Sequence, residues 1–307
     1  MDVTTIRLVG GTGGLLVLAS IAGLILKWRF PGPTVDNLNA RIRAWWFMVA
    51  IFAAALLTGG VGSVLLFGFT SFWALREFIT LTPTRRGDHR TLFWAFFVIT
   101  PLQYYLVAIQ WYGLFSILIP VYAFLFVPIR NAIEGDCERF LERTAKIQWG
   151  LMVCVYCVSY APALLALDIP GFAGRQANLL FFLVLVTQMS DVLQYVFGKT
   201  LGRHKIAPHV SPNKTWEGFI GGVLAATALG TGLWWATPFS PLQAAGMSLS
   251  ICLMGFGGGL TMSAIKRDRG VKDYGSLIEG HGGVMDRIDS ICFAAPVFFH
   301  LTRFYFT

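Results

Sequence analysis

The chain has 307 residues, of which 55% are hydrophobic and 13% are charged, and its formal net charge is +8. Soluble domains carry about 25% charged residues, so this composition excludes an ordinary soluble domain and indicates a polytopic membrane protein. Because each helical span needs roughly 20 apolar residues, we expect an all-α membrane helix bundle that forms one integral membrane domain over residues 1–307.

Ten apolar runs follow one another along the sequence, and each is a candidate transmembrane helix. They lie near residues 8–26, 44–60, 61–75, 92–110, 112–128, 147–165, 178–197, 218–236, 243–262 and 290–306. The second and third runs are separated only at Gly59-Gly60-Val61-Gly62, and the fourth and fifth only at Trp111-Tyr112-Gly113. Because these two divisions depend on short turn signals, the sequence predicts eight to ten transmembrane helices.

The positions of the basic residues favour the ten-helix arrangement. All but three of the 24 lysines and arginines fall in alternate connections, beginning with the one after the first span; the exceptions are Arg7, Arg175 and Arg303. Connections rich in lysine and arginine face the cytoplasm, so we expect the N-terminus outside and the polar loops inside.

Two carboxylates and two glycine clusters stand out within the spans. Asp191 lies near the inner end of the seventh span, where a charge costs about 2.5–3.5 kcal/mol on insertion scales. We expect it to serve a site, with metal ligation as one role, or else to form a buried pair with a lysine. Glu77 is a weaker candidate because Arg76 could neutralise it.

Two clusters of glycines within the spans are expected to allow close packing between helices. The first cluster comprises Gly10, Gly11, Gly13 and Gly14, and the second comprises Gly218, Gly221 and Gly222.

The segment 198–217 is the first of two polar islands. It carries cations, hydroxyls and a carboxylate, namely Lys199, Arg203, Lys205, Ser211, Lys214, Thr215 and Glu217. The glycines of the G-x-x-x-x-G-K-[ST] phosphate loop are missing, but lysines and hydroxyls still offer charge and donors to a phosphate. The alternative interpretation is an ordinary basic loop on the inner side.

The segment 263–290 is the second and denser polar island. Residues spaced i, i+3 and i+4 share a helix face on each side of a glycine turn. They are Ser263, Lys266 and Arg267 before the turn, and Asp286, Asp289 and Ser290 after it. Backbone N–H groups in Gly280-His281-Gly282-Gly283, at a helix N-terminus, favour an anion. The pattern predicts a cradle for a nucleoside triphosphate with Mg²⁺, and the alternative is again a basic loop with acidic surface partners.

The two islands together resemble the signature motifs of the phosphatidate cytidylyltransferase (CDP-diacylglycerol synthase) family. The second island matches at Ser263, Lys266, Arg267, Lys272, Asp273, Gly275, Gly280-His281-Gly282-Gly283, Asp286, Arg287 and Asp289. Upstream matches are Asp191, Tyr195, Gly198, Lys199, Ser211, Pro212, Lys214, Thr215, Glu217 and Gly218. The resemblance makes residues 178–307 the catalytic half, whereas residues 1–170 match only as a multi-span hydrophobic half.

The resemblance implies that CTP and phosphatidate give CDP-diacylglycerol and pyrophosphate for phospholipid synthesis. It implies catalytic roles for Asp286, Lys266, Arg267, Lys272 and Asp289, and a metal site at Asp286, Asp191 and Asp289. Implied substrate contacts are Ser211, Lys214, Thr215, Glu217, Ser263, His281, Gly282, Gly283 and Arg287. The expected cofactor is Mg²⁺, with a second cation as an option.

The expected partners are CTP, phosphatidic acid and membrane lipids, with a homodimer as an option. The expected location is the bacterial cytoplasmic (inner) membrane, with the active site facing the cytoplasm. The sequence shows no stacking platform and no basic soluble domain, so nucleic acid is not an expected partner.

Two departures from the family pattern leave alternatives open. Glu279 stands where the family has proline before the glycine turn, and Gly259 stands where the family has an aspartate that is expected to bind metal. Glycine offers no ligand atom, so either another carboxylate compensates or the chain is a catalytically impaired homologue. A CTP-dependent enzyme acting on another lipid phosphate and an anion transporter are the remaining alternatives.

Overall fold

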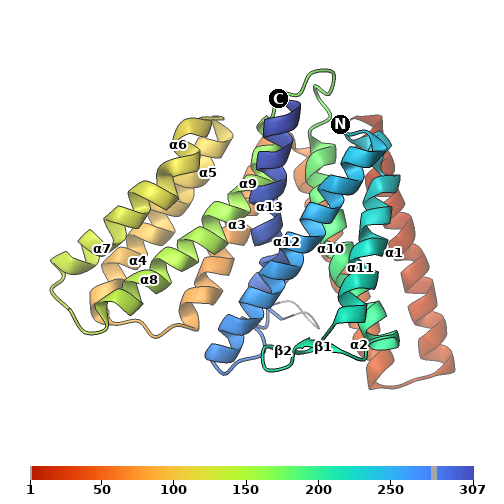
Figure 1. Cartoon of the computed structure of the whole chain (residues 1–307), viewed down its shortest axis with the longest axis horizontal. Helices are drawn as coiled ribbons and strands as arrows, with labels where there is room; N and C mark the ends of the chain where they lie inside the picture. The colour runs from red at the N-terminus through yellow and green to blue at the C-terminus, as the bar shows by residue number, and fades with distance from the viewer. Residues whose placement is uncertain (1, 278–281) are drawn as a thin grey trace.

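The computed structural model describes residues 2–277 and 282–307, and these residues form an all-α bundle (Figure 1). Its long helical segments are α1 (Val3–Arg29), α2 (Pro33–Leu57), α3 (Gly59–Thr80), Arg86–Ala108, Tyr112–Ile133, Phe140–Ala166, α10 (Ala177–Thr200), α11 (Trp216–Gly232), α12 (Pro241–Asp268) and α13 (Met285–Phe306). Seven helices of the described part are long and apolar enough to cross a membrane. The chain is therefore a polytopic all-α membrane protein, and the ten helical segments of the described part match the ten predicted runs; that all ten cross the membrane stays a prediction.

Both of the uncertain divisions occur where they were predicted. Gly59, with φ +73°, separates α2 from α3, and Gln110, with φ +59°, lies between the fourth and fifth helical segments. Left-handed backbone is ordinary for glycine and uncommon for glutamine, and in either case it stops a right-handed helix. Each long apolar run is thus folded back on itself as two antiparallel helices.

Both chain termini lie at one end of the bundle, as an even number of spans requires (Figure 1). The opposite end, here called the polar end, carries the α1–α2, α3–α4, α7–α8, α10–α11 and α12–α13 connections (Figure 1). These are the connections in which the sequence concentrates lysine and arginine. Their shared side agrees with the predicted topology, and the cytoplasmic orientation of that side stays a prediction.

The first polar connection is much shorter than predicted. Helix α2 begins with Pro33 at its first turn, so Arg41 and Arg43 lie within the helix rather than in a loop. Proline suits this position because its missing N–H would have no partner there. A salt bridge of 3.1 Å between Lys27 Nζ and Asp36 Oδ1 joins the two helices across the turn. The predicted loop over 27–43 was wrong, because hydropathy detects the apolar part of a helix and not its polar extension.

Three of the helical segments contain π-helical stretches close to a proline. The segment α4 (His89–Trp94) to α5 (Thr100–Ala108) contains Ala95–Ile99, and α6 (Tyr112–Ile117) to α7 (Phe124–Ile133) contains Leu118–Ala123. The segment α8 (Phe140–Gly150) to α9 (Val158–Ala163) contains Leu151–Cys157. The prolines are Pro101, Pro120 and Pro162. Because proline lacks an N–H, the local ladder shifts to a wider turn.

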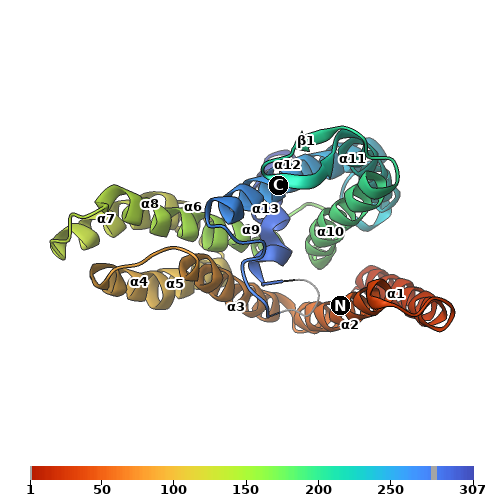
Figure 2. The same cartoon turned by 90° about the horizontal axis from the view of Figure 1, so that it is seen from below.

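The last four helices pack together beside a short hairpin of β1 (Lys205–Ala207) and β2 (Ser211–Thr215) (Figure 2). Helices α10 and α11 approach closely because Gly218 and Gly222 face Gln194; a Cβ atom at Gly222 would lie 2.5 Å from Gln194 N. This confirms the predicted glycine packing there. Around Gly10–Gly14, in contrast, no other side chain of the described part lies within 4 Å of an added Cβ, so the packing predicted for that cluster was wrong within this chain.

Candidate active site

Asp286, in the first turn of α13, is fully engaged by hydrogen-bond donors. Lys266 Nζ, near the end of α12, lies 2.7 Å from Asp286 Oδ1, and both side chains are buried. The backbone N–H groups of Tyr274 and Gly283 donate to Asp286 Oδ2 at 2.8 and 3.0 Å. Hydrogen bonds between a carboxylate and a charged or backbone donor are short and directional, so they fix the position of this side chain. Asp286 therefore fixes the α12–α13 connection against the first turn of α13.

Glu77, near the end of α3, accepts hydrogen bonds from the first turn of α13. Its carboxylate oxygens accept from Val284 N at 3.0 Å and from Met285 N at 2.8 Å. Arg76 does not serve as the predicted neutralising partner in the contacts observed, because its guanidinium lies 4.9 Å above the Trp73 ring. A carboxylate at a helix N-terminus satisfies free N–H groups and complements the helix dipole. The sequence interpretation underrated Glu77, which couples α3 to the motif-bearing helices.

The glycines of the α12–α13 connection make room for these two carboxylates. A Cβ atom at Gly275 would lie 2.6 Å from Glu77 Oε1, and one at Gly282 would lie 2.8 Å from Asp286 Oδ2. Gly282 also has φ +82°, a conformation that favours glycine. A Cβ atom at Gly283 would collide with the Glu77 carboxylate. Within the turn expected to bind an external anion, the N–H group of Gly283 is occupied by Asp286; Glu279, Gly280 and His281 of the predicted turn lie outside the described residues.

A second acidic cluster joins α10 to α13. Ser290 Oγ lies 2.8 Å from Asp191 Oδ2, to which it donates, and 3.4 Å from Asp289 Oδ1. The Lys214 ammonium reaches toward both carboxylates from β2 and lies 4.4 Å above the Phe256 ring. Burial lowers the pKa of Lys214, while the charges of Asp191 and Asp289 oppose that shift. We refer to Asp191, Asp289, Ser290 and Lys214 as the Asp191–Asp289 cluster.

Gly259 faces this second cluster directly. A Cβ atom at Gly259 would lie 3.2 Å from Lys214 Nζ, 3.5 Å from Ser290 Oγ and 4.0 Å from Asp289 Oδ2. The carboxylate that the family pattern leads one to expect at this position would therefore enter the space between Lys214 and Asp289. The departure at Gly259 is thus placed beside the site rather than at a distance from it.

The three predicted metal ligands fall into the two clusters. Asp191 and Asp289 share Ser290, whereas Asp286 is held by Lys266. Within the described ranges, no three His, Cys, Asp or Glu side chains gather as a metal site. Mg²⁺ is commonly bound by one or two carboxylates together with substrate phosphates and water. Asp191 and Asp289 fit that partial ligand set.

Two residues that were predicted to contact substrate, Thr215 and Glu217, make hydrogen bonds that hold the ends of the β1–β2 hairpin. Thr215 caps α11 by accepting from Gly218 N at 3.2 Å, and its side chain is buried. Glu217, before the apolar part of α11, accepts from Arg203 N at 3.0 Å and also bonds His204. Hydrogen bonds from the Arg203 backbone and the His204 side chain lower the pKa of Glu217 to about 2. These bonds hold the hairpin so that Lys214 enters the bundle, and substrate contact by Thr215 and Glu217 stays a prediction.

The remaining predicted residues surround the two clusters. Ser263 Oγ donates to Gly259 O at 2.6 Å, and Arg267 Nε donates to Val210 O at 3.2 Å, which ties α12 to the hairpin. Ser211 pairs in register with Ala207 in the hairpin. Lys272 is exposed in the α12–α13 connection. The backbone oxygen of Arg287 accepts from Gln188 Nε2 at 3.2 Å.

The fold and site define an integral membrane protein that gathers carboxylates and cations among the helices at its polar end. The chain belongs to the Cytidylyltransferase family, whose model matches residues 39–305 and so includes both polar islands. Membership of this family places the chain among the nucleotidyltransferases.

Two bacterial relatives match most of the chain. The protein named YnbB of Escherichia coli K12, itself uncharacterised, is 40% identical over 294 residues, covering 94% of this chain and 95% of the relative. The phosphatidate cytidylyltransferase of Staphylococcus aureus strain COL is 28% identical over 256 residues, covering 80% of this chain and 92% of the relative. That of Staphylococcus saprophyticus is 38% identical over 120 residues, covering 38% and 46%.

Proposed function

We propose that this protein transfers the cytidylyl group of CTP to the phosphate of a membrane lipid, with phosphatidate as the acceptor and CDP-diacylglycerol and pyrophosphate as products. The observation that carries the proposal is the Asp191–Asp289 cluster, where the inward-pointing Lys214 meets two carboxylates in a chain of the Cytidylyltransferase family. The choice of phosphatidate is supported by the staphylococcal relatives. We further propose that the polar end faces the cytoplasm of a bacterial inner membrane, where CTP is present.

The reaction needs charge handling more than proton transfer. A phosphate oxygen of the lipid attacks the α-phosphorus of CTP, forms a new P–O bond and displaces pyrophosphate as the α–β bridging bond breaks. The nucleophile is already an anion, so the barrier lies in bringing two anions together and in stabilising the leaving group. Besides Lys266, which is paired with Asp286, the cations whose charges act on Asp191 and Asp289 are the Lys214 ammonium and the Arg287 guanidinium. In the proposal they hold the phosphates in line.

The carboxylates of the Asp191–Asp289 cluster would hold Mg²⁺, which when bound supplies positive charge to the triphosphate. Asp286 and Lys266 position the site in a different way, because their ion pair fixes the start of α13, from which Asp289 projects one turn later. In this assignment Asp286 acts as a positioning residue, and its role as a metal ligand is the alternative. Gly259 removes one carboxylate from the cluster, which makes a catalytically impaired homologue the second candidate function.

A transfer assay tests the proposal. Purified protein in phosphatidate vesicles, supplied with CTP labelled at the α-phosphate, should place the label in lipid when Mg²⁺ is present and should not do so with a chelator. A lipid product formed only with a different lipid phosphate would correct the acceptor. Absence of any labelled lipid would contradict the enzyme, and uptake of unchanged label into the vesicles would indicate transport.

A further inference from the structure

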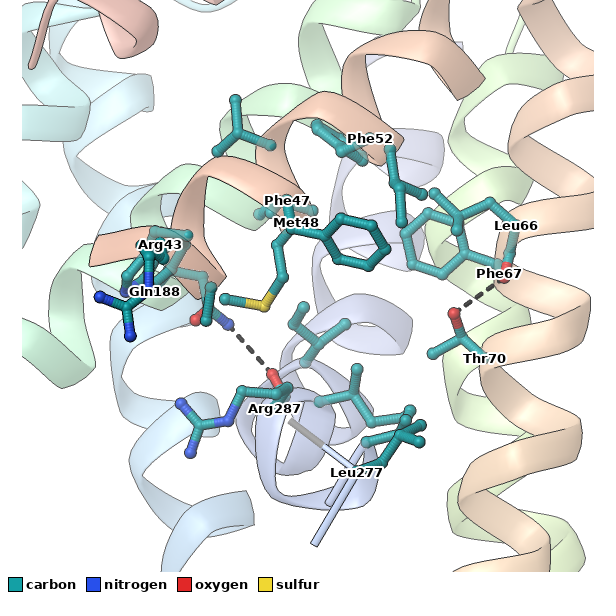
Figure 3. A pocket seen from close by; sticks show the side chains of 18 residues that line it. Arg43, Phe47, Met48, Phe52, Leu66, Phe67, Thr70, Gln188, Leu277 and Arg287 are labelled. Carbon is teal, nitrogen blue, oxygen red and sulfur yellow. Dashed lines mark hydrogen bonds between the residues drawn. The ribbon is translucent and has the colours of Figure 1, made fainter. Parts of the chain in front are cut away.

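A groove of about 660 Å³ opens between α2, α3, α10 and α13 (Figure 3). Its wall is almost entirely apolar, and the residues contributed by α2 and α3 include Phe47, Met48, Phe52, Leu66 and Phe67. The volume lies within the range of about 300–1,000 Å³ that is typical of ligand sites. The groove is therefore large enough to hold a specific ligand, and it is larger than the small gaps that imperfect packing leaves.

Two cations lie together on one side of this apolar groove. Arg43 of α2 and Arg287 of α13 line it, with Gln188 of α10 near them, while Leu66, Phe67 and Thr70 lie on the other side (Figure 3). Arg287 Nε is buried and has no hydrogen-bond partner in the described part of the chain. A buried guanidinium N–H without a partner is costly, so a bound anion would be favoured there.

The cationic side of the groove adjoins the candidate site through Arg287. Arg287 lies between Asp286 and Asp289 on α13, and its charge acts on both Asp191 and Asp289. Helix α2 is largely exposed along its apolar length, so the groove borders the lipid phase. A ligand with an apolar body and an anionic head, entering from the membrane, matches both the wall and the cations.

We propose that this groove binds the acyl chain of an anionic glycerophospholipid, with the lipid phosphate held by Arg43 and Arg287. The proposal rests on the proposed function, because it makes this lipid the acceptor that meets CTP at the Asp191–Asp289 cluster. Arg43 belongs to none of the sequence motifs and lies in the hydrophobic half of the chain. Its place in the groove gives it the role of a specificity residue for the lipid.

Matched variants test the two parts of the groove by kinetics. Arg43→Gln should raise the KM for phosphatidate by about tenfold or more with kcat nearly unchanged, because a charge-assisted hydrogen bond to phosphate is lost. Its control is Arg41→Gln on the same helix, where Arg41 bonds Asn37 and does not line the groove.

The second variant tests the apolar wall. Leu66→Trp should fill the groove and raise the KM for long-chain phosphatidate more than the KM for a short-chain form. Its control is Leu65→Trp, since Leu65 is 55% exposed on the same helix. Equal effects in variant and control would overturn the proposal.

A crosslinking measurement separates this proposal from the proposed function, because it needs no turnover. Phosphatidate with a diazirine in its acyl chain should label peptides of α2 and α3 around residues 47–67 in native protein and in Leu65→Trp, and should label Leu66→Trp several-fold less. Label elsewhere, or label undiminished in Leu66→Trp, would overturn the groove even if cytidylyl transfer is observed. Groove labelling without transfer would retain the lipid site and reject the enzyme.

Discussion

The two acidic clusters of the polar end use the same type of side chain in different ways. Asp286 receives three donors, namely the Lys266 ammonium and two backbone N–H groups. In the Asp191–Asp289 cluster, two carboxylates share one serine hydroxyl, Asp289 also accepts from Ser290 N at 2.8 Å, and the approaching cations come from separate elements. The single carboxylate of the first cluster is more fully occupied by donors and holds a helix in place, whereas the two carboxylates of the second cluster retain more acceptor capacity for a ligand. The comparison teaches that the number of hydrogen-bond donors around a carboxylate, and not the presence of the carboxylate itself, distinguishes a structural acid from a reactive one.

Lys214→Met should give the largest effect. Removing the ammonium should lower transfer by about 10²–10³-fold, the usual cost of losing one electrostatic group at a phosphate or oxyanion. The melting temperature should fall, because the change removes a cation that faces the Asp191 and Asp289 carboxylates, so transfer is compared at equal amounts of folded protein. The matched control is Lys205→Met in the same hairpin, where the lysine is exposed and transfer should remain near native. Equal losses in both variants would show that Lys214 has no special role.

Glu77→Gln should act mainly on stability. The change keeps the shape of the side chain but weakens the cap on α13, at a cost of about 1–3 kcal/mol. A thermal melt in detergent measures this cost. Glu138→Gln is the control, because Glu138 forms a surface pair with Arg85 and should cost at most about 1 kcal/mol. A melt of Glu77→Gln that matches the control would contradict the assigned cap.

Gly259→Asp should sharpen the comparison by adding an acceptor to the second cluster only. A carboxylate beside Lys214 and Asp289 should lower the Mg²⁺ concentration for half-maximal transfer several-fold, about tenfold per 1.4 kcal/mol of added binding. Gly259→Asn has the same shape without the charge and should leave the Mg²⁺ dependence unchanged. If both variants behave alike, position 259 affects packing and not metal binding.

The smallest expected effect is a pH dependence carried by Glu217. Its pKa is lowered to about 2 by bonds to Arg203 and His204, so the stabilisation is fully present above the unfolded value, near pH 4.3, and is lost as pH falls toward 2. Melts of native protein and Glu217→Gln should therefore differ most at about pH 6, and the difference should shrink steadily as the pH falls from about 4 toward 2. A difference that is constant with pH would contradict the hairpin clamp.

The fold was largely predictable because a bilayer constrains helices strongly. Length, hydropathy and loop charge predicted ten helices with their polar connections at one end, and glycine turns predicted both divisions. The polar start of α2 was missed because its residues, such as Asp36 and Arg41, carry no apolar signal. The sequence around the two glycine clusters is similar, so both were predicted to pack closely. Only Gly218 and Gly222 do so, whereas Gly10–Gly14 has no close neighbours in the described part of the chain.

The site was only partly predictable because its parts come from distant elements. Motif spacing brought Lys266, Asp286 and Asp289 together, since these residues flank one connection. Glu77 lies 207 residues from the N–H group that it caps, and no local pattern signals such a partner. The same reason hides Arg43, whose relation to Arg287 depends on how α2 packs beside α13.

The most direct test of the difference between the clusters measures transfer and melting temperature together for Asp289→Asn and Asp286→Asn. We predict that Asp289→Asn loses about 10²–10³-fold in transfer with a native-like melt, whereas Asp286→Asn melts markedly lower because it leaves Lys266 buried and unpaired. A native-like rate in folded Asp289→Asn, or a native-like melt in Asp286→Asn, would contradict the assignment of a reactive and a structural acid.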